Sequence, residues 1–89
     1  MKTVDELDSN FTQDLYIKIG INVKKFRESK GITQLELSQA IGHKSVTVIS
    51  CCEICYKNYH FNIEHLQKIA YVLDVDISEF FKDIKTKID

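Results

Sequence analysis

Hydrophobic residues in the first third of the chain recur at the spacing of an α-helix. They lie three or four positions apart and therefore share one helix face. These residues are Leu15, Ile19, Val23 and Phe26. Gly31 follows them, and glycine readily takes the left-handed conformation that ends a helix. The pattern predicts a first helix that starts near Thr12 or Asp14 and ends at Ser29.

A shorter second helix is predicted directly afterwards. Thr33 and Glu36 have the spacing of a capping box, in which each side chain satisfies a backbone amide of the other residue. Leu37 and Ile41 then lie four positions apart, on one helix face. Gly42 suits a sharp stop because it takes a positive φ without steric cost.

The apolar pattern restarts after a few polar residues, which predicts a third helix from Ser45, as its N-cap, to about Cys55. Ile49 and Cys52 are expected in the core. The segment after this helix contains no glycine, so Asn58 is expected to take the left-handed conformation there. Two short helices joined by a tight turn form a helix-turn-helix.

Two further helices are predicted in the last third of the chain. Asn62 is expected to cap the fourth helix. Its inward face is expected to carry Ile63, Leu66, Ile69 or Ala70, and Leu73. Asp76 and Glu79 have the spacing of another capping box, which predicts a fifth helix. Because the chain has no proline and no sustained alternation of period two, it is expected to be an all-α bundle of five helices.

Several of these segments resemble the Cro/CI-type (Xre-like) helix-turn-helix regulators, which include small phage repressors and restriction–modification controller proteins. The similar segments, residues 19–34, 34–53 and 61–81, keep the order of the family. The resemblance implies a compact bundle of the lambda-repressor-like type. The chain departs from the family by one extra residue between Gly42 and Glu53, which leaves the register of the third helix open. The expected division is an N-terminal arm, 1–13, a helix-turn-helix DNA-binding domain, 14–82, and a C-terminal tail, 83–89.

Charge is distributed unevenly along the chain. The formal net charge of −1 argues against general attraction to nucleic acid. Residues 15–57, however, carry seven basic and three acidic side chains, and this segment contains the helix-turn-helix. Attraction to phosphate can therefore be local. The sequence has no apolar run long enough to span a bilayer and no apolar signal core near its start, so we expect a cytoplasmic protein.

Cysteine and histidine residues offer an alternative chemistry that the spacing does not favour. Cys51, Cys52 and Cys55 do not match the paired C-x₂-C blocks of structural zinc sites. We expect small, buried or partly buried thiols, with no metal and no cofactor. A redox sensor stays open if Cys51 is exposed on the surface that faces DNA. The sequence has no nucleophile elbow, phosphate loop or metalloprotease signature, so it is not expected to be an enzyme.

Aromatic residues interleave with basic ones after the third helix. Tyr56, Tyr59 and Phe61 could form a stacking platform for a single strand. We prefer a loop whose aromatic side chains cover the core, because the known platform folds are sheets.

The resemblance implies a sequence-specific regulator that binds double-stranded DNA with its third helix in the major groove, and we expect a repressor. Bases would be contacted by Val46, Thr47, Ser50 and Cys51. Phosphates would be contacted by Gln34, Lys44, Ser45, Lys57 and Asn58. Because the segment from Val46 to Cys51 offers no paired hydrogen bonds to guanine or adenine, discrimination is expected to depend on DNA shape or on Lys44.

A domain this small contacts few bases, so a homodimer is expected. The fifth helix and the tail would supply its surface, with Tyr71, Val75, Ile77, Phe81 and Ile84 as the apolar residues. The alternative is a protein-interaction module, such as an antitoxin or an adaptor. The acidic balance and the weakly polar third helix favour that alternative, and salt-dependent binding to duplex DNA separates the two.

Overall fold

All regular structure in the computed structural model, which describes residues 1–84, is helical. The four α-helices are α1 (Phe11–Ser29), α2 (Gln34–Ala40), α3 (Thr47–Ile54) and α4 (Ile63–Leu73). Three 3-10 segments accompany them: η1 (Val4–Glu6), η2 (Tyr56–Asn58) and η3 (Ile77–Phe81). The prediction of an all-α protein is confirmed. Within residues 1–84, no helix is both long and apolar enough to cross a bilayer.

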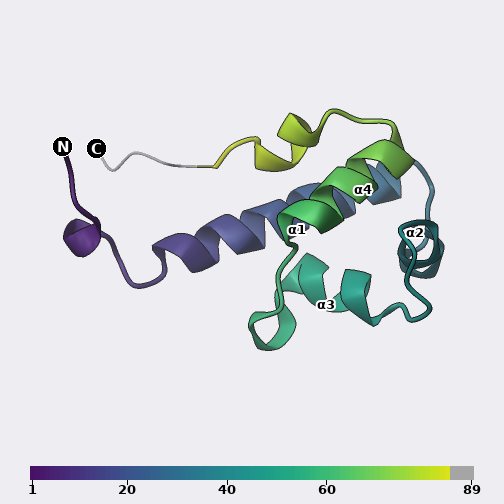
Figure 1. The fold of residues 1–89 in the computed structure, drawn as a ribbon, viewed down its shortest axis with the longest axis horizontal. Helices are drawn as coiled ribbons and strands as arrows, with labels where there is room; N and C mark the ends of the chain where they lie inside the picture. The colour runs from purple at the N-terminus through teal and green to yellow at the C-terminus, as the bar shows by residue number, and fades with distance from the viewer. Residues whose placement is uncertain (85–89) are drawn as a thin grey trace.

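α1 is the longest helix and the centre of the arrangement. α3 packs on one side of it and η3 on the other, while its N-terminal half extends beyond the remaining helices (Figure 1). α2 packs against α3 and α4. Every one of these elements contributes to one core. Its most deeply buried apolar side chains are Val23, Leu37, Ile49, Leu66, Ile69, Leu73 and Phe80.

The N-terminal caps of α2 and α4 are formed by side chains. Thr33 Oγ1 accepts from the Glu36 amide at 3.1 Å, and Glu36 Oε1 accepts from the Thr33 amide at 2.9 Å. The predicted capping box of α2 is therefore confirmed. Asn62 caps α4 as predicted, and its partner is His65, whose Nδ1 accepts from the Asn62 amide at 3.1 Å.

The predicted inward face of α4 is right except at its first residue. Leu66, Ile69, Ala70 and Leu73 are buried, but 71% of Ile63 is exposed. Ile63 lies in the first turn, next to the cap, where the helix begins at the surface of the bundle.

The prediction of a fifth α-helix is wrong, because residues Ile77–Phe81 form the 3-10 segment η3. Four α-helices, not five, are present in residues 1–84. The Asp76 carboxylate accepts from the Ser78 amide at 2.9 Å and does not share a capping box with Glu79. Glu79 instead pairs with Lys82 at 2.7 Å.

A buried side chain of α1 explains why η3 does not continue as an α-helix. Asn22 Nδ2 donates to the carbonyl oxygens of Phe80 and Lys82 at 2.9 and 3.0 Å. Carbonyls at the end of a helical segment need partners outside it. Here α1 supplies those partners, and the same contacts hold Phe80 in the core.

Gly20 lets the backbones of α1 and α3 approach each other closely. A Cβ atom at this position would lie 2.5 Å from the carbonyl oxygen of Glu53 and 2.8 Å from that of Cys52. From sequence, Gly20 only weakens the interior of α1, by about 1 kcal/mol relative to alanine. In the structure it is the residue that sets the distance between the two helices.

We predict that Gly20→Ala lowers the free energy of unfolding. The helix gains about 1 kcal/mol from alanine, but the conflict with the α3 backbone costs more, since overpacking typically costs about 1–3 kcal/mol and rigid backbone cannot yield easily. Chemical denaturation measures the difference. Lys24→Ala, exposed on the same helix, is the control and should change stability by less than about 0.5 kcal/mol. A Gly20→Ala protein more stable than its parent would contradict this packing.

Candidate nucleic-acid interface

The turn between α2 and α3, residues 41–46, is fixed to α2 by a buried serine. Ser38 is fully buried, its hydroxyl donates to the Ser45 carbonyl oxygen, and its own carbonyl accepts from the His43 amide at 3.0 Å. Gly42 has a φ of 99°, as expected for a glycine that ends a helix sharply. The start of α3 therefore has a defined position relative to α2.

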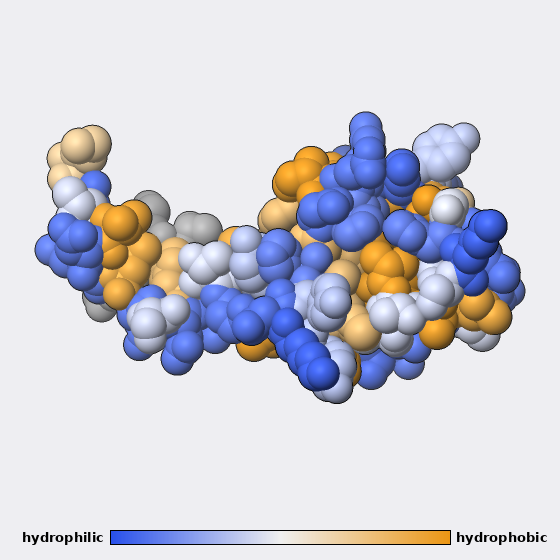
Figure 2. All heavy atoms as spheres, turned by 60° about the horizontal axis from the view of Figure 1, so that its bottom comes forward, coloured by the Kyte–Doolittle hydropathy of each residue, from blue (hydrophilic) through white to orange (hydrophobic). Residues whose placement is uncertain are grey.

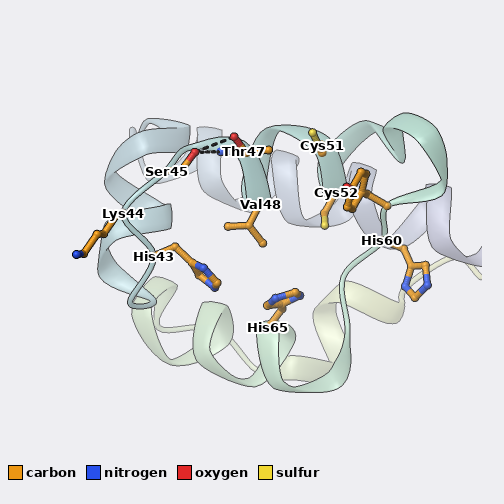
Figure 3. Close-up of a pocket in the computed structure, with 10 residues that line it drawn as sticks. His43, Lys44, Ser45, Thr47, Val48, Cys51, Cys52, His60 and His65 are labelled. Carbon is orange, nitrogen blue, oxygen red and sulfur yellow. Dashed lines mark hydrogen bonds between the residues drawn. The ribbon is translucent and has the colours of Figure 1, made fainter.

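The start of α3 differs from the prediction. The helix begins at Thr47, with Val46 as the N-cap residue, and not at Ser45. Ser45 Oγ still accepts from the Thr47 amide at 3.2 Å and lies 2.7 Å from Thr47 Oγ1 (Figure 3). A serine hydroxyl can bond an amide two residues later in a turn as well as at a cap.

The inward positions of α3 follow the prediction, since Ile49 and Cys52 are both buried. Its end does not. α3 stops at Ile54, because Cys55 takes a left-handed conformation with a φ of 54°. Asn58 is left-handed as predicted, with a φ of 67°, and Lys57 is too, with a φ of 49°. The left-handed conformation costs free energy at a residue other than glycine. Three such residues in one segment indicate that the packing around them fixes this segment firmly.

Glu53, at the C-terminal end of α3, binds side chains from two other helices. Arg27 of α1 donates from Nε and Nη2 to its two carboxylate oxygens, at 2.7 and 3.1 Å. The remaining Arg27 nitrogen, Nη1, donates to the Ile32 carbonyl at 2.8 Å. Gln34 of α2 donates from Nε2 to Glu53 Oε1 at 2.9 Å. The hydrogen bond with Glu53 is also the main reason why the pKa of Arg27 is raised.

This network was not found from the sequence. Arg27 lies off the apolar stripe of the first helix and looks like a surface residue, yet it is buried. Its partner is 26 positions away, so no local pattern connects them. The network also changes the interpretation of Gln34, whose side chain is half-buried and already bonded to Glu53.

Most of the predicted DNA-binding residues lie at the surface. The exposed ones are Lys44, Ser45, Val46, Thr47, Lys57 and Asn58. The partly buried ones are Gln34, Ser50 and Cys51. In Figure 3, Ser45, Thr47 and Cys51 lie along the outer side of α3, whereas Val48 and Cys52 point toward the inner side. The helix thus separates an outer face from a face turned to α4.

The loop after α3 covers the core with only one of its aromatic residues. Phe61 is buried, but Tyr56 and Tyr59 are more than half exposed. The prediction that the aromatic residues of this loop fold over the core is therefore wrong for the two tyrosines. Lys57 Nζ lies 5.4 Å from the centre of the Tyr56 ring, and His60 stacks on Tyr16 of α1 at 3.7 Å. These contacts hold the loop against α1 and orient Lys57.

A groove of about 520 Å³ lies between α3 and the start of α4. His43 and His65 face each other across it, with ring centres 5.9 Å apart (Figure 3). Cys52 lines its floor, and burial raises the pKa of this thiol to about 11. Burial also raises the pKa of Cys55. Since the thiolate is the reactive and metal-binding form, burial disfavours both kinds of chemistry at these two cysteines. No cluster of three or more potential metal ligands occurs within residues 1–84.

No protein-family model and no curated protein matches the chain. Solved structures do match it. The restriction-modification controller protein C.AhdI from Aeromonas hydrophila is 25% identical, with a TM-score of 0.66 over 78% of this chain and 98% of that one. The hypothetical transcription factor NHTF from Neisseria is 28% identical, with a TM-score of 0.65 over 78% and 74% of the two chains.

A third similar structure contains DNA. It is SinR, the master regulator for biofilm formation, in complex with DNA; SinR is from Bacillus subtilis. It is 27% identical to this chain, with a TM-score of 0.59 over 70% of this chain and 95% of that one. Together these structures confirm the resemblance to Cro/CI-type helix-turn-helix regulators that the sequence indicates.

We predict that the folded chain loses stability as the pH falls below about 6.5, through His65. Burial, and then the nearby His43, lower the pKa of His65 below its ordinary value of 6.5. Among the other charged neighbours, Glu64 opposes this shift, and Lys68 and His60 add to it. The unfolded chain therefore binds the proton more readily, so acid favours unfolding. Protonation of Nδ1 would also break the cap that His65 forms with Asn62.

Urea denaturation of the parent and of His65→Gln, at about pH 7.5 and pH 5, tests this prediction. Glutamine can keep the reciprocal cap but does not titrate. The parent should lose more stability between the two pH values than His65→Gln does. Equal losses in the two proteins would show that another group is responsible.

Proposed function

We propose that this chain is a sequence-specific regulator of transcription that binds double-stranded DNA, inserts α3 into the major groove and acts as a repressor. The observation that carries the proposal is the exposed outer side of α3, which a fixed turn and the buried Glu53 hold at the surface. The likeness to C.AhdI and to SinR bound to DNA supports it.

Two lysines bracket α3. Lys44 lies in the turn before the helix, and Lys57 lies in the left-handed segment after it; both are exposed. In the proposed complex they contact phosphates on either side of the groove, with Ser45 and Asn58 beside them. These contacts fix the position of the protein on the duplex and carry no sequence information themselves.

Gln34 has a different part in the proposed complex. Its side chain is bonded to Glu53, so its contact with phosphate falls to the backbone amide at the first turn of α2. Val46, Thr47, Ser50 and Cys51 face the bases from the outer side of α3. A protein bound in this way reads sequence through a few short side chains.

We also propose that the chain acts as a homodimer, through η3 and the tail. Apolar side chains are exposed around this end of the domain: 87% of Tyr71, 37% of Ile77 and 39% of Phe81. Val75 is partly buried and packs against the core, and so does Ile84, so these two residues serve folding as well as any interface. The tail from residue 85 lies outside the described residues.

The proposed phosphate contacts can be tested by substitution. Lys44→Ala and Lys57→Ala should each weaken binding to all duplexes alike and reduce the dependence of log K on log salt by about 0.9. Binding measured over a salt series with a random duplex pool gives both results. Lys68→Ala, on α4, is the matched control and should leave the slope unchanged. A slope unchanged in both test variants, or no duplex binding by the parent, would argue for a protein-interaction role instead.

The proposed association can be tested by substitution as well. Phe81→Asp should give a folded monomer that binds its DNA much more weakly, because a charge on an apolar dimer surface opposes pairing. Ile63→Asp changes an apolar residue that is also exposed but lies at the start of α4, and this variant should remain dimeric. Sedimentation distinguishes monomer from dimer. It should be measured at a concentration on the order of tens of micromolar, since mass action favours the dimer at high concentration. A parent protein that sediments as a monomer would refute the dimer.

A further inference from the structure

The outer side of α3 has no side chain that can make the paired hydrogen bonds usual in base recognition. Guanine is ordinarily bound by arginine or lysine, and adenine by asparagine or glutamine, each through two hydrogen bonds. None of these four residue types occurs between positions 46 and 56. The one charged residue in this stretch, Glu53, is buried and paired with Arg27. Recognition by this helix must therefore use another chemical feature of the bases.

The two hydroxyl groups on the outer side of α3 already form hydrogen bonds within the protein. Thr47 Oγ1 lies 2.7 Å from Ser45 Oγ, with which it shares a hydrogen bond. Ser50 Oγ donates to the Thr47 carbonyl at 3.3 Å. A hydroxyl that is bonded inside the helix has less hydrogen-bonding capacity left for a base edge. This detail comes from the structure, since the sequence alone shows only that both residues are polar.

The groups that α3 presents are consequently largely apolar. Val46 is 36% exposed at the helix start, and Thr47, also exposed, carries a methyl group beside its hydroxyl. Cys51 lies four positions after Thr47, on the same face. The side of the molecule brought forward in Figure 2 mixes hydrophobic with hydrophilic residues. In the major groove, the one apolar feature of a base pair is the C5-methyl group of thymine.

We propose that the binding site of this protein presents thymines to the first turn of α3, and that Val46, with Thr47 next to it, recognises them through their C5-methyl groups. The inference rests on the proposed function, because it assumes that α3 enters the major groove. It makes Val46 a determinant of specificity. Lys44 and Lys57 add affinity at phosphates without selecting a base.

The test begins with selection of bound duplexes from a random pool by the full chain. In the selected duplex, each thymine is then replaced singly by uracil, which pairs identically and lacks only the C5-methyl group. At one or two positions in each half-site, affinity should fall about fourfold per methyl group removed, the size expected for one buried methylene-sized group.

Val46→Ala identifies the protein partner of these methyl groups. In this variant, the uracil substitution at the matching position should have little further effect, because the contact is already lost. Ile63→Ala removes an exposed apolar side chain outside α3 and should keep the full sensitivity to uracil. Val46 is an exposed residue, so both variants are expected to fold normally.

The outcomes separate the inference from the proposed function. A selected duplex that is bound tightly, but whose affinity changes less than twofold with uracil at every position, would overturn thymine recognition and leave DNA binding intact. A selected site without thymine opposite α3 would do the same. If no duplex is bound, the proposed function itself fails. Uracil sensitivity that disappears in Val46→Ala and persists in Ile63→Ala would support the inference.

Discussion

The orientation of α3 depends on one buried carboxylate. Glu53 accepts hydrogen bonds from Arg27 of α1 and Gln34 of α2, and so connects the three helices at a single point. Removing one member of such a pair leaves an uncompensated buried charge and typically costs about 3–5 kcal/mol. Close by, Gly20 lets the backbone of α1 reach the carbonyls of Cys52 and Glu53. The position of the outer face of α3 follows from these two contacts.

In the proposed interface, the two faces of α3 have different roles. The core face of α3 provides stability through Ile49 and Cys52, while the outer face is left with short side chains whose hydroxyls are partly engaged. Positive charge lies at the ends of the helix, in Lys44 and Lys57. In the proposed complex, affinity comes mainly from phosphates, so a net charge of −1 for the chain does not oppose DNA binding at this surface.

Local patterns predicted much of the fold. The stripe of the first helix, the capping box at Thr33 and the cap at Asn62 depend on neighbouring residues and are right. Predictions failed where distant residues decide the outcome. Asn22 of α1 donates to two carbonyls at the end of η3 and just after it, and η3 resembled an α-helix from its own sequence. In the candidate site, the exposed residues of α3 were predictable from its period. The burial of Arg27 and the bonding of the hydroxyls were not, because they require the folded arrangement.

In the proposed complex, the outer side of α3 is the surface that meets DNA. Amide chemical shifts of the isotope-labelled protein, measured by NMR as a selected duplex is added, test this directly. The largest changes should occur in residues 44–51 and 57–58, with small changes along the exposed side of α4. Changes concentrated in α4 and η3, with α3 unaffected, would contradict it.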